Sequence, residues 1–101
     1  GPTASGAYPQ ANHTLAVDAS NPFVPMGTHV IMNGVEYVVE DTGNFAQYGV
    51  QFDVFYGDHA SASAHGHQTW EAYIADKQWK SGSRSNDNKR SEPAGCNTHE
   101  P

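Results

Sequence analysis

The chain has 101 residues and a formal net charge of −6 with histidine neutral, and 37% of its residues are apolar and 16% are charged. This length is typical of one compact domain, and so small a charged fraction disfavours a helical bundle. The chain holds only five Lys and Arg residues. These form no basic cluster interleaved with aromatic residues, so we expect no nucleic-acid partner. No apolar run approaches the ~20 residues that span a bilayer.

Five β-prone stretches, one hairpin signal and one short helix follow along the chain. The irregular entry over residues 3–13 precedes the first strand, and Asn33-Gly34 is a strong two-residue hairpin signal. The helix is predicted over 59–65, with Asp58 as its N-cap and Gly66 at its end. The expected strands are 14–18, 28–33, 35–41, 50–56 and 68–75. This pattern predicts an all-β fold, a small barrel with one short helix, over residues 3–76.

The two ends of the chain are expected to lie outside that barrel. Gly1-Pro2 resembles the remnant of a protease-cleaved tag, so we expect upstream targeting or anchoring segments to have been trimmed. Residues 77–101 are polar and without periodicity, which predicts a tail or a surface-wrapping extension. We expect Trp79, within this stretch, to dock on the barrel. The lone Cys96 has no partner for an internal disulfide and is expected to be an incidental thiol.

Two aspartates stand where β-strands prefer apolar residues. Alternation places Asp41 on the face of Val35, Tyr37 and Val39, at the rim of the core. Asp53 lies inside the 50–56 strand, and its same-face neighbour Phe55 disfavours the ionised form of a carboxyl. A half-buried carboxylate is costly unless it is hydrogen-bonded or has a chemical task. The loop between the two strands therefore brings together a candidate acid/base pair.

Simpler interpretations remain open for several of these residues. Asp18 and Asp41 could cap strand ends by accepting backbone N–H groups, whereas a mid-strand Asp53 is harder to explain in that way. His59 either reaches the Asp53 strand or is a surface residue at the helix start. The His65-Gly66-His67 pair has no cysteine partner and matches no usual zinc spacing, so we expect no metal site and no cofactor.

Four motifs in fixed order extend this picture. The segments LAVDASNPFVPMGTHVIMNGVEYVVEDTG and FDVFYGDHASASAHG contain an A-V-D strand end at Asp18, a P-x-G-T turn at residues 25–28, an E-D-T-G turn at residues 40–43 and an F-D-V-F strand around Asp53. The opening T-A-S-G at residues 3–6 resembles a first strand of the same pattern. Together, residues 3–75 resemble the three-aspartate (3D) domain of bacterial cell-wall proteins. These include stationary-phase survival and resuscitation-factor-like proteins, and the domain is related to the catalytic domain of membrane-bound lytic transglycosylase A.

The resemblance implies a six-stranded double-psi β-barrel that cleaves peptidoglycan. The reaction is lytic transglycosylation of the MurNAc-GlcNAc bond, which leaves a 1,6-anhydro-MurNAc end. In the match, Asp53 corresponds to the catalytic acid and Asp41 to the neighbouring aspartate that orients it. The residues expected to bind substrate are Asp18, Thr42, Gly43, Phe45, Tyr48, Tyr56 and His59, with the three aromatic rings stacking on sugars. The loop at 44–49 departs from the family's G-G-x-I-K-G pattern.

The resemblance also implies a partner, a location and an oligomeric state, and it leaves other functions open. The expected partner is the glycan strand, the expected location is extracellular or cell-wall associated, and a monomer is expected. A glycoside hydrolase, like the endoglucanases with double-psi barrels, would use Asp41 as base and Asp53 as acid with a water between them. An expansin-like module would bind polysaccharide without cleaving it. A structural or interaction domain would need Asp53 only for stability.

Overall fold

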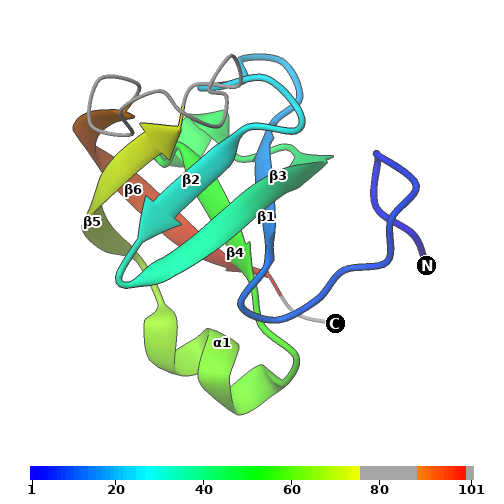
Figure 1. The fold of residues 1–101 in the computed structure, drawn as a ribbon. Coiled ribbons are helices and arrows are strands. Elements are labelled where there is room, and N and C mark those ends of the chain that lie inside the picture. Colours follow the sequence, from blue (N-terminus) through cyan, green and yellow to red (C-terminus); the bar gives the residue numbers. More distant parts are fainter. Residues whose placement is uncertain (76–88, 100–101) are drawn as a thin grey trace.

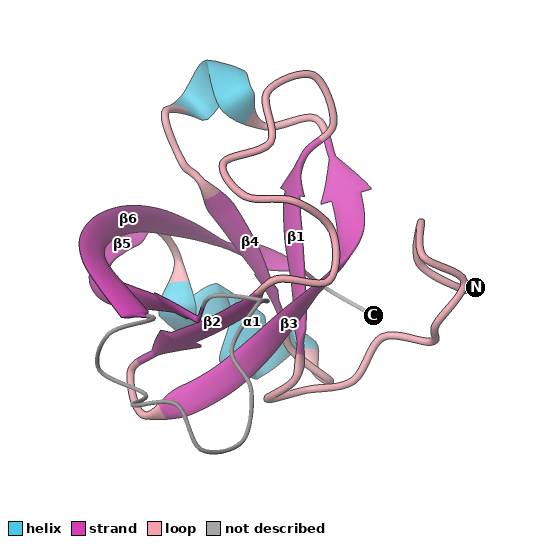
Figure 2. Cartoon of the chain, turned by 45° about the horizontal axis from the view of Figure 1, so that its top comes forward, coloured by secondary structure: helices cyan, strands magenta, loops and turns pink. Residues whose placement is uncertain are grey.

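The structure is a computed structural model that describes residues 1–75 and, for the backbone, residues 89–99. A curled sheet dominates it, and an α-helix lies at one end of the sheet (Figure 1). A short 3-10 helix lies at the opposite end (Figure 2). In chain order the elements are β1 (Thr14–Asp18), β2 (His29–Met32), β3 (Val35–Gly43), η1 (Ala46–Tyr48), β4 (Phe52–Phe55), α1 (His59–His65), β5 (Gln68–Ala75) and β6 (Lys89–His99).

The strands are hydrogen-bonded in the order β1-β3-β2-β5-β6-β4, and the sheet closes because β4 pairs with β1. The pairs β1–β3 and β4–β6 are parallel, and the other pairs are antiparallel. Exchanging β1 with β4, β2 with β5 and β3 with β6 leaves this pairing pattern unchanged. The barrel therefore consists of two halves of three strands with the same internal arrangement. The predicted class, mostly strand with one short helix in a small barrel, is confirmed.

Local sequence signals explain several elements. The predicted bounds of β1, β5 and α1 agree with the structure. At the start of α1 the Asp58 side chain accepts a hydrogen bond from the Ser61 N–H at 2.8 Å, and Gly66 ends the helix with a φ of 57°. Asn33 and Gly34 have φ values of 50° and 78°, as the tight turn between β2 and β3 requires. Strand β4 is shorter than the predicted 50–56 stretch.

Two predictions about the ends of the barrel are wrong. Residues 89–99 are not a tail, because they form β6, which pairs with both β4 and β5. Cys96 therefore lies in a strand, opposite Phe52 and Gln68 in the register. Residues 3–6 form a turn, in agreement with the irregular entry predicted from the residues, and not the first strand that the resemblance implied: the Gly6 N–H donates to the Thr3 carbonyl at 2.9 Å. The predicted docking of Trp79 lies outside the described residues.

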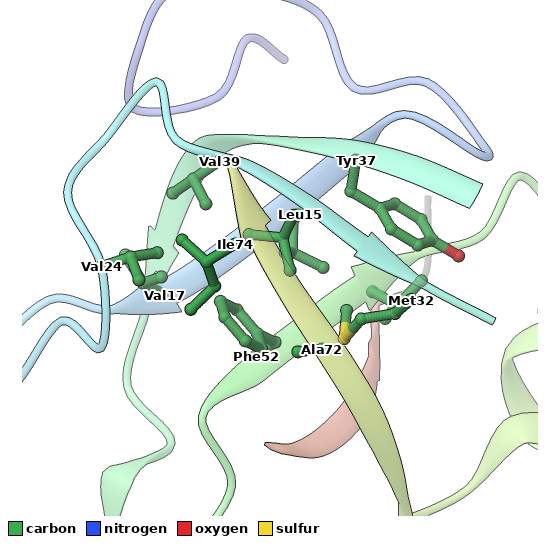
Figure 3. Close-up of a cluster of buried hydrophobic side chains, with 11 residues drawn as sticks. Leu15, Val17, Val24, Met32, Tyr37, Val39, Phe52, Ala72 and Ile74 are labelled. Atoms are coloured by element: carbon green, nitrogen blue, oxygen red, sulfur yellow. The ribbon is translucent and has the colours of Figure 1, made fainter. Parts of the chain in front are cut away.

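The barrel interior is apolar and closely filled. Leu15, Val30, Met32 and Phe52 are each fully buried, and Figure 3 shows Leu15, Met32 and Phe52 among the side chains that converge from several strands. The ring of Phe23 packs edge-on against Phe52, with 5.6 Å between centroids and an 89° interplanar angle. Among the described residues, no helix is long and apolar enough to cross a membrane.

Candidate functional site

Strand β1 is buried on both of its faces. Leu15 and Val17 point into the barrel, while Thr14, Ala16 and Asp18 alternate with them and face outward. Ala16 is nevertheless 2% exposed, because Phe45 and Val50 from the loop after β3 pack over it. We call Ala16, Phe45 and Val50 the outer cluster. Loops, and not another strand, bury this outward face of β1.

A bulge in β3 decides which way Asp41 points. Leu15 pairs with Val39 but Ala16 pairs with Asp41, so Glu40 is an extra residue on β3. Paired residues face the same side of a sheet, and a one-residue slip moves a side chain to the other face. Asp41 therefore faces outward with Ala16. The prediction that Asp41 continues the inward face of Tyr37 and Val39 is wrong.

Asp53 lies at the same height in the barrel as Asp41, on the opposite side of β1. It pairs with Ala16 across the antiparallel β1–β4 ladder. Asp41 and Asp53 thus flank Ala16 on three adjacent strands, both on the outward face. Because neighbouring strands lie about 4.8 Å apart, the Cα atoms of the two aspartates are about 10 Å apart. The two aspartates that the sequence analysis paired thus lie on strands that both neighbour β1.

Backbone N–H groups hold the Asp41 carboxylate. Its Oδ1 accepts hydrogen bonds from the Thr42 N–H at 2.8 Å and from the Ala4 N–H at 3.0 Å. The Ser5 N–H donates to the Glu40 carbonyl at 3.0 Å, which fixes the N-terminal turn beside the bulge. Ala4 and Ser5 thus help to position Asp41, a role that no local pattern signalled.

Asp18 ties two loops together at the end of β1. Its Oδ1 accepts the Phe45 and Ala46 N–H groups, both at 2.7 Å. Its Oδ2 accepts the Ser20 hydroxyl at 2.6 Å, the Ser20 N–H at 3.0 Å and the Asn21 N–H at 3.1 Å. The Ser20 hydroxyl, followed by the Phe45 N–H, holds the pKa of the Asp18 carboxyl far below its ordinary range. With five donors on it, Asp18 has the geometry of the strand-end cap that turn preferences suggested.

A second outward-facing network involves a residue that the sequence analysis missed. Glu40 Oε1 accepts the Thr14 hydroxyl at 2.8 Å, and Glu40 Oε2 lies 3.2 Å from His13 Nε2. Thr14 is 2% exposed, and its hydroxyl also accepts the Gln10 N–H at 2.9 Å. Regular alternation places Glu40 and Asp41 on opposite faces of β3. Because of the bulge, both side chains lie on the outward face, next to β1.

The predicted sugar-contacting residues divide into exposed and buried ones. Tyr48 is 60% exposed at the end of η1, whereas Phe45 is 4% exposed within the outer cluster. A Cβ at Gly43 would lie 3.1 Å from the Phe45 ring, so this glycine allows the ring to approach the backbone. The Tyr56 hydroxyl is 2.8 Å from Nδ1 of the buried His65, next to α1. Of the three rings, Tyr48 is thus exposed, Tyr56 is partly buried and Phe45 is buried.

The other predicted contact residues lie at the surface. Thr42 is exposed, and its backbone N–H is used by Asp41. His59 is exposed at the first position of α1, with Nε2 3.2 Å from the Ser63 hydroxyl. The helix lies at the end of the barrel opposite η1 (Figure 2). His59 is thus placed as a surface residue at the helix start.

Two hollows adjoin Asp18 at the η1 end of the barrel, each with a volume of about 220 Å³. The first is lined by Asp18, Asn21, Pro22, Phe23, Ala46, Gly49, Val50 and Gln51. The second is lined by Asp18, Ser20, Asn44, Phe45, Ala46 and Gln47. Asp18 and Ala46 line both hollows, and the other lining residues belong largely to the loops whose N–H groups Asp18 accepts.

Searches against protein-family models, curated proteins and solved structures each gave no match. Within the part of the chain that the structure describes, no three His, Cys, Asp or Glu side chains are grouped as metal ligands. The site is thus defined by its geometry: two outward-facing carboxylates on either side of Ala16, an apolar outer cluster between them, and loops held by Asp18.

Proposed function

We propose that this barrel is a lytic transglycosylase that cleaves peptidoglycan glycan strands. The observation that carries the proposal is the register that places Asp41 and Asp53 on either side of Ala16. Two carboxylates on one face, separated by a small residue, suit a reaction at a glycosidic bond. The ordered motifs around Asp18, Asp41 and Asp53 support the same assignment.

The strand pairing supports a double-psi barrel as the scaffold. Each half contributes one parallel pair, β1–β3 or β4–β6, and the halves are interleaved because β1 pairs with β4 and β2 with β5. Two equivalent crossing halves of this kind are what the double-psi arrangement requires. In this proposal β6 supplies the strand that the resemblance assigned to residues 3–6.

Asp53 is proposed as the general acid and then the general base. Its protonated carboxyl donates to the glycosidic oxygen as the bond to C1 breaks and positive charge develops on the sugar ring. The C6 hydroxyl of the same sugar then attacks C1, and the Asp53 carboxylate takes the hydroxyl proton. The attack is intramolecular, so proximity replaces the positioned water that a hydrolase needs.

Asp41 is proposed to stabilise the positive charge at C1. Its Oδ1 is oriented by the Ala4 and Thr42 N–H groups, so the carboxylate is held in place before substrate binds. Phe45 and Val50 of the outer cluster pack over Ala16 on the surface beside the two aspartates, and apolar surroundings strengthen electrostatic interactions. Tyr48 is proposed to stack on a sugar ring beside this surface, since it is 60% exposed.

The strand spacing favours a second candidate, an inverting hydrolase. Carboxyl groups about 6.5–9.5 Å apart leave room for a water, and the Cα separation of about 10 Å permits that range. In this alternative Asp41 is the base that activates the water, and Asp53 remains the acid. The two reactions differ in their product, which is a reducing end for the hydrolase and a 1,6-anhydro end for the transglycosylase.

The decisive experiment compares Asp53→Asn with Glu71→Gln on purified glycan strands. Glu71 is an exposed carboxylate of β5, so its variant controls for loss of one negative charge. We expect Asp53→Asn to lose about 10²–10⁴-fold of product formation and Glu71→Gln to retain it. Mass spectrometry then identifies the ends. Anhydro ends support the transglycosylase, reducing ends support the hydrolase, and an Asp53→Asn variant with more than about a tenth of wild-type product contradicts both.

A further inference from the structure

The first of the two hollows next to Asp18 has walls that are fixed without a ligand. One wall is the turn after β1, held by the Ser20 and Asn21 N–H groups on Asp18 Oδ2. The other contains η1, held by the Phe45 and Ala46 N–H groups on Oδ1. Since the Asp18 carboxylate is hydrogen-bonded to both walls, their separation is fixed, and the volume of about 220 Å³ between them is formed before a ligand binds.

The side chains around this hollow match the chemistry of a sugar. Phe23 is 39% exposed and lines it, and its ring is fixed by the edge contact with Phe52. An immobilised aromatic face packs against the C–H face of a pyranose ring at little entropic cost. Asn21 and Gln51 also line the hollow, and an amide side chain has both donors and acceptors for hydroxyl and N-acetyl groups.

Charge decides between a neutral and an anionic ligand. Among the described residues that line the hollow there is no Lys or Arg, and the charged one is the Asp18 carboxylate. The chain as a whole carries a formal charge of −6. An anionic group in this hollow would be repelled and would find no cationic partner among the lining residues. A neutral N-acetylated sugar meets no such penalty.

We propose that the hollow formed by Phe23, Asn21 and Gln51 is a subsite for one neutral N-acetylhexosamine unit of the glycan. The inference rests on the proposed function, because the glycan strand is taken from it as the ligand. Gln51 precedes Asp53 by two residues, which is about 7 Å along an extended chain. A sugar in the hollow therefore lies beside the one that is cleaved, and Asp18 acts as the residue that positions the subsite walls.

Binding is tested without turnover, on the full chain carrying Asp53→Asn, by amide NMR titration with chitotetraose. We expect the largest shifts at the Asn21 and Gln51 side-chain amides. Phe23→Leu keeps an apolar side chain on Phe52 but removes the ring, and we expect about five- to tenfold weaker binding. Phe23→Tyr is expected to restore it. Tyr73→Leu, which removes a 44% exposed ring from β5, is expected to bind as tightly as the parent.

The outcomes separate this subsite from the proposed catalysis. Unchanged binding by Phe23→Leu, shifts centred away from Asn21 and Gln51, or no binding of chitotetraose overturns the subsite, even if wild-type protein releases anhydro ends. Phe23-dependent binding by a protein that releases no soluble product supports the subsite and contradicts the catalytic role. If Phe23→Leu unfolds, the position of the shifts in the parent decides.

Discussion

The two faces of strand β1 are equally buried but are covered in different ways. Leu15 and Val17 are covered by side chains of other strands, so their burial depends on the apolar interior alone. Thr14, Ala16 and Asp18 are covered by loops and the N-terminal region, which are held by the carboxylates of Asp18 and Glu40. The interior thus sets the stability of the fold. The outward face sets the shape of the site and depends on the ionised carboxylate of Asp18.

The largest loss of stability is expected from the interior face. Phe52→Ala removes a fully buried ring that other core side chains surround, and we expect the free energy of unfolding to fall by about 3–5 kcal/mol. Urea denaturation followed by circular dichroism measures it. A loss no larger than that of an outward-face variant would contradict the division between the two faces.

A smaller and local effect is expected from Asp18→Asn, with a distinct pH dependence. The folded-state pKa of Asp18 is lowered, so its stabilising contribution is complete above the unfolded carboxyl pKa of about 4 and is lost as the pH falls below that value. Wild-type melting temperature should therefore fall on acidification below about pH 4, and this slope should be shallower in Asp18→Asn.

Amide hydrogen exchange locates the same effect in the chain. In Asp18→Asn we expect faster exchange at Phe45 and Ala46, whose N–H groups bond the carboxylate, with little change in the strands β2 and β5. Uniformly faster exchange across the barrel would show instead that Asp18 supports the whole fold. Asp58→Asn serves as a control, since Asp58 also has a lowered pKa but caps α1 at the opposite end.

The Thr14 hydroxyl offers a finer test of the outward face. Thr14→Val keeps the side-chain volume but removes the hydroxyl that donates to Glu40 and accepts from the Gln10 N–H. We expect a loss of about 1–2 kcal/mol in the free energy of unfolding, because two partly buried hydrogen bonds of the Thr14 hydroxyl are lost. Thr14→Ser keeps the hydroxyl and should recover most of the lost free energy of unfolding. A loss in Thr14→Ser as large as that in Thr14→Val would show that the methyl group contributes as much as the hydroxyl, and would contradict the assignment of the effect to the hydrogen bonds.

The smallest change in stability is expected for Tyr48→Ala. Its side chain is 60% exposed, so the free energy of unfolding should change by no more than about 0.5 kcal/mol. If Tyr48 stacks on a sugar, KM for glycan strands should rise severalfold while kcat changes little. Steady-state release of soluble fragments measures both. An unchanged KM would remove Tyr48 from the substrate surface.

Short-range signals in the sequence account for much of the barrel. Apolar alternation located β1 and β5, the Asn33-Gly34 pair located the turn between β2 and β3, and Asp58 and Gly66 bounded α1. Each of these signals lies within a single element or turn, so each can be recognised without the rest of the fold. Asp53 was also singled out locally, because an aspartate inside an apolar strand is unusual.

Other features had no local signal. Strand β6 contains Pro93 and Gly95 and lacks alternation, so strand patterns disfavour it, yet it pairs with both β4 and β5. The bulge at Glu40 exists only in the register between β1 and β3, and it reverses the face that alternation predicts for Asp41. The burial of Phe45 likewise depends on Asp18, twenty-seven residues away in the chain.

The sequence by itself thus determined the segments that form β1 to β5, where the hairpin and the helix lie, and which aspartates stand out. Only the tertiary structure decided that Asp41 and Asp53 flank Ala16 on the outer face, that β6 joins β4 to β5, and that Asp18 shapes the hollows next to it. The physical reason is the distance along the chain over which each interaction acts. Alternation and capping are fixed by neighbouring residues, whereas register, bulges and loop burial are fixed by contacts between residues far apart in the chain.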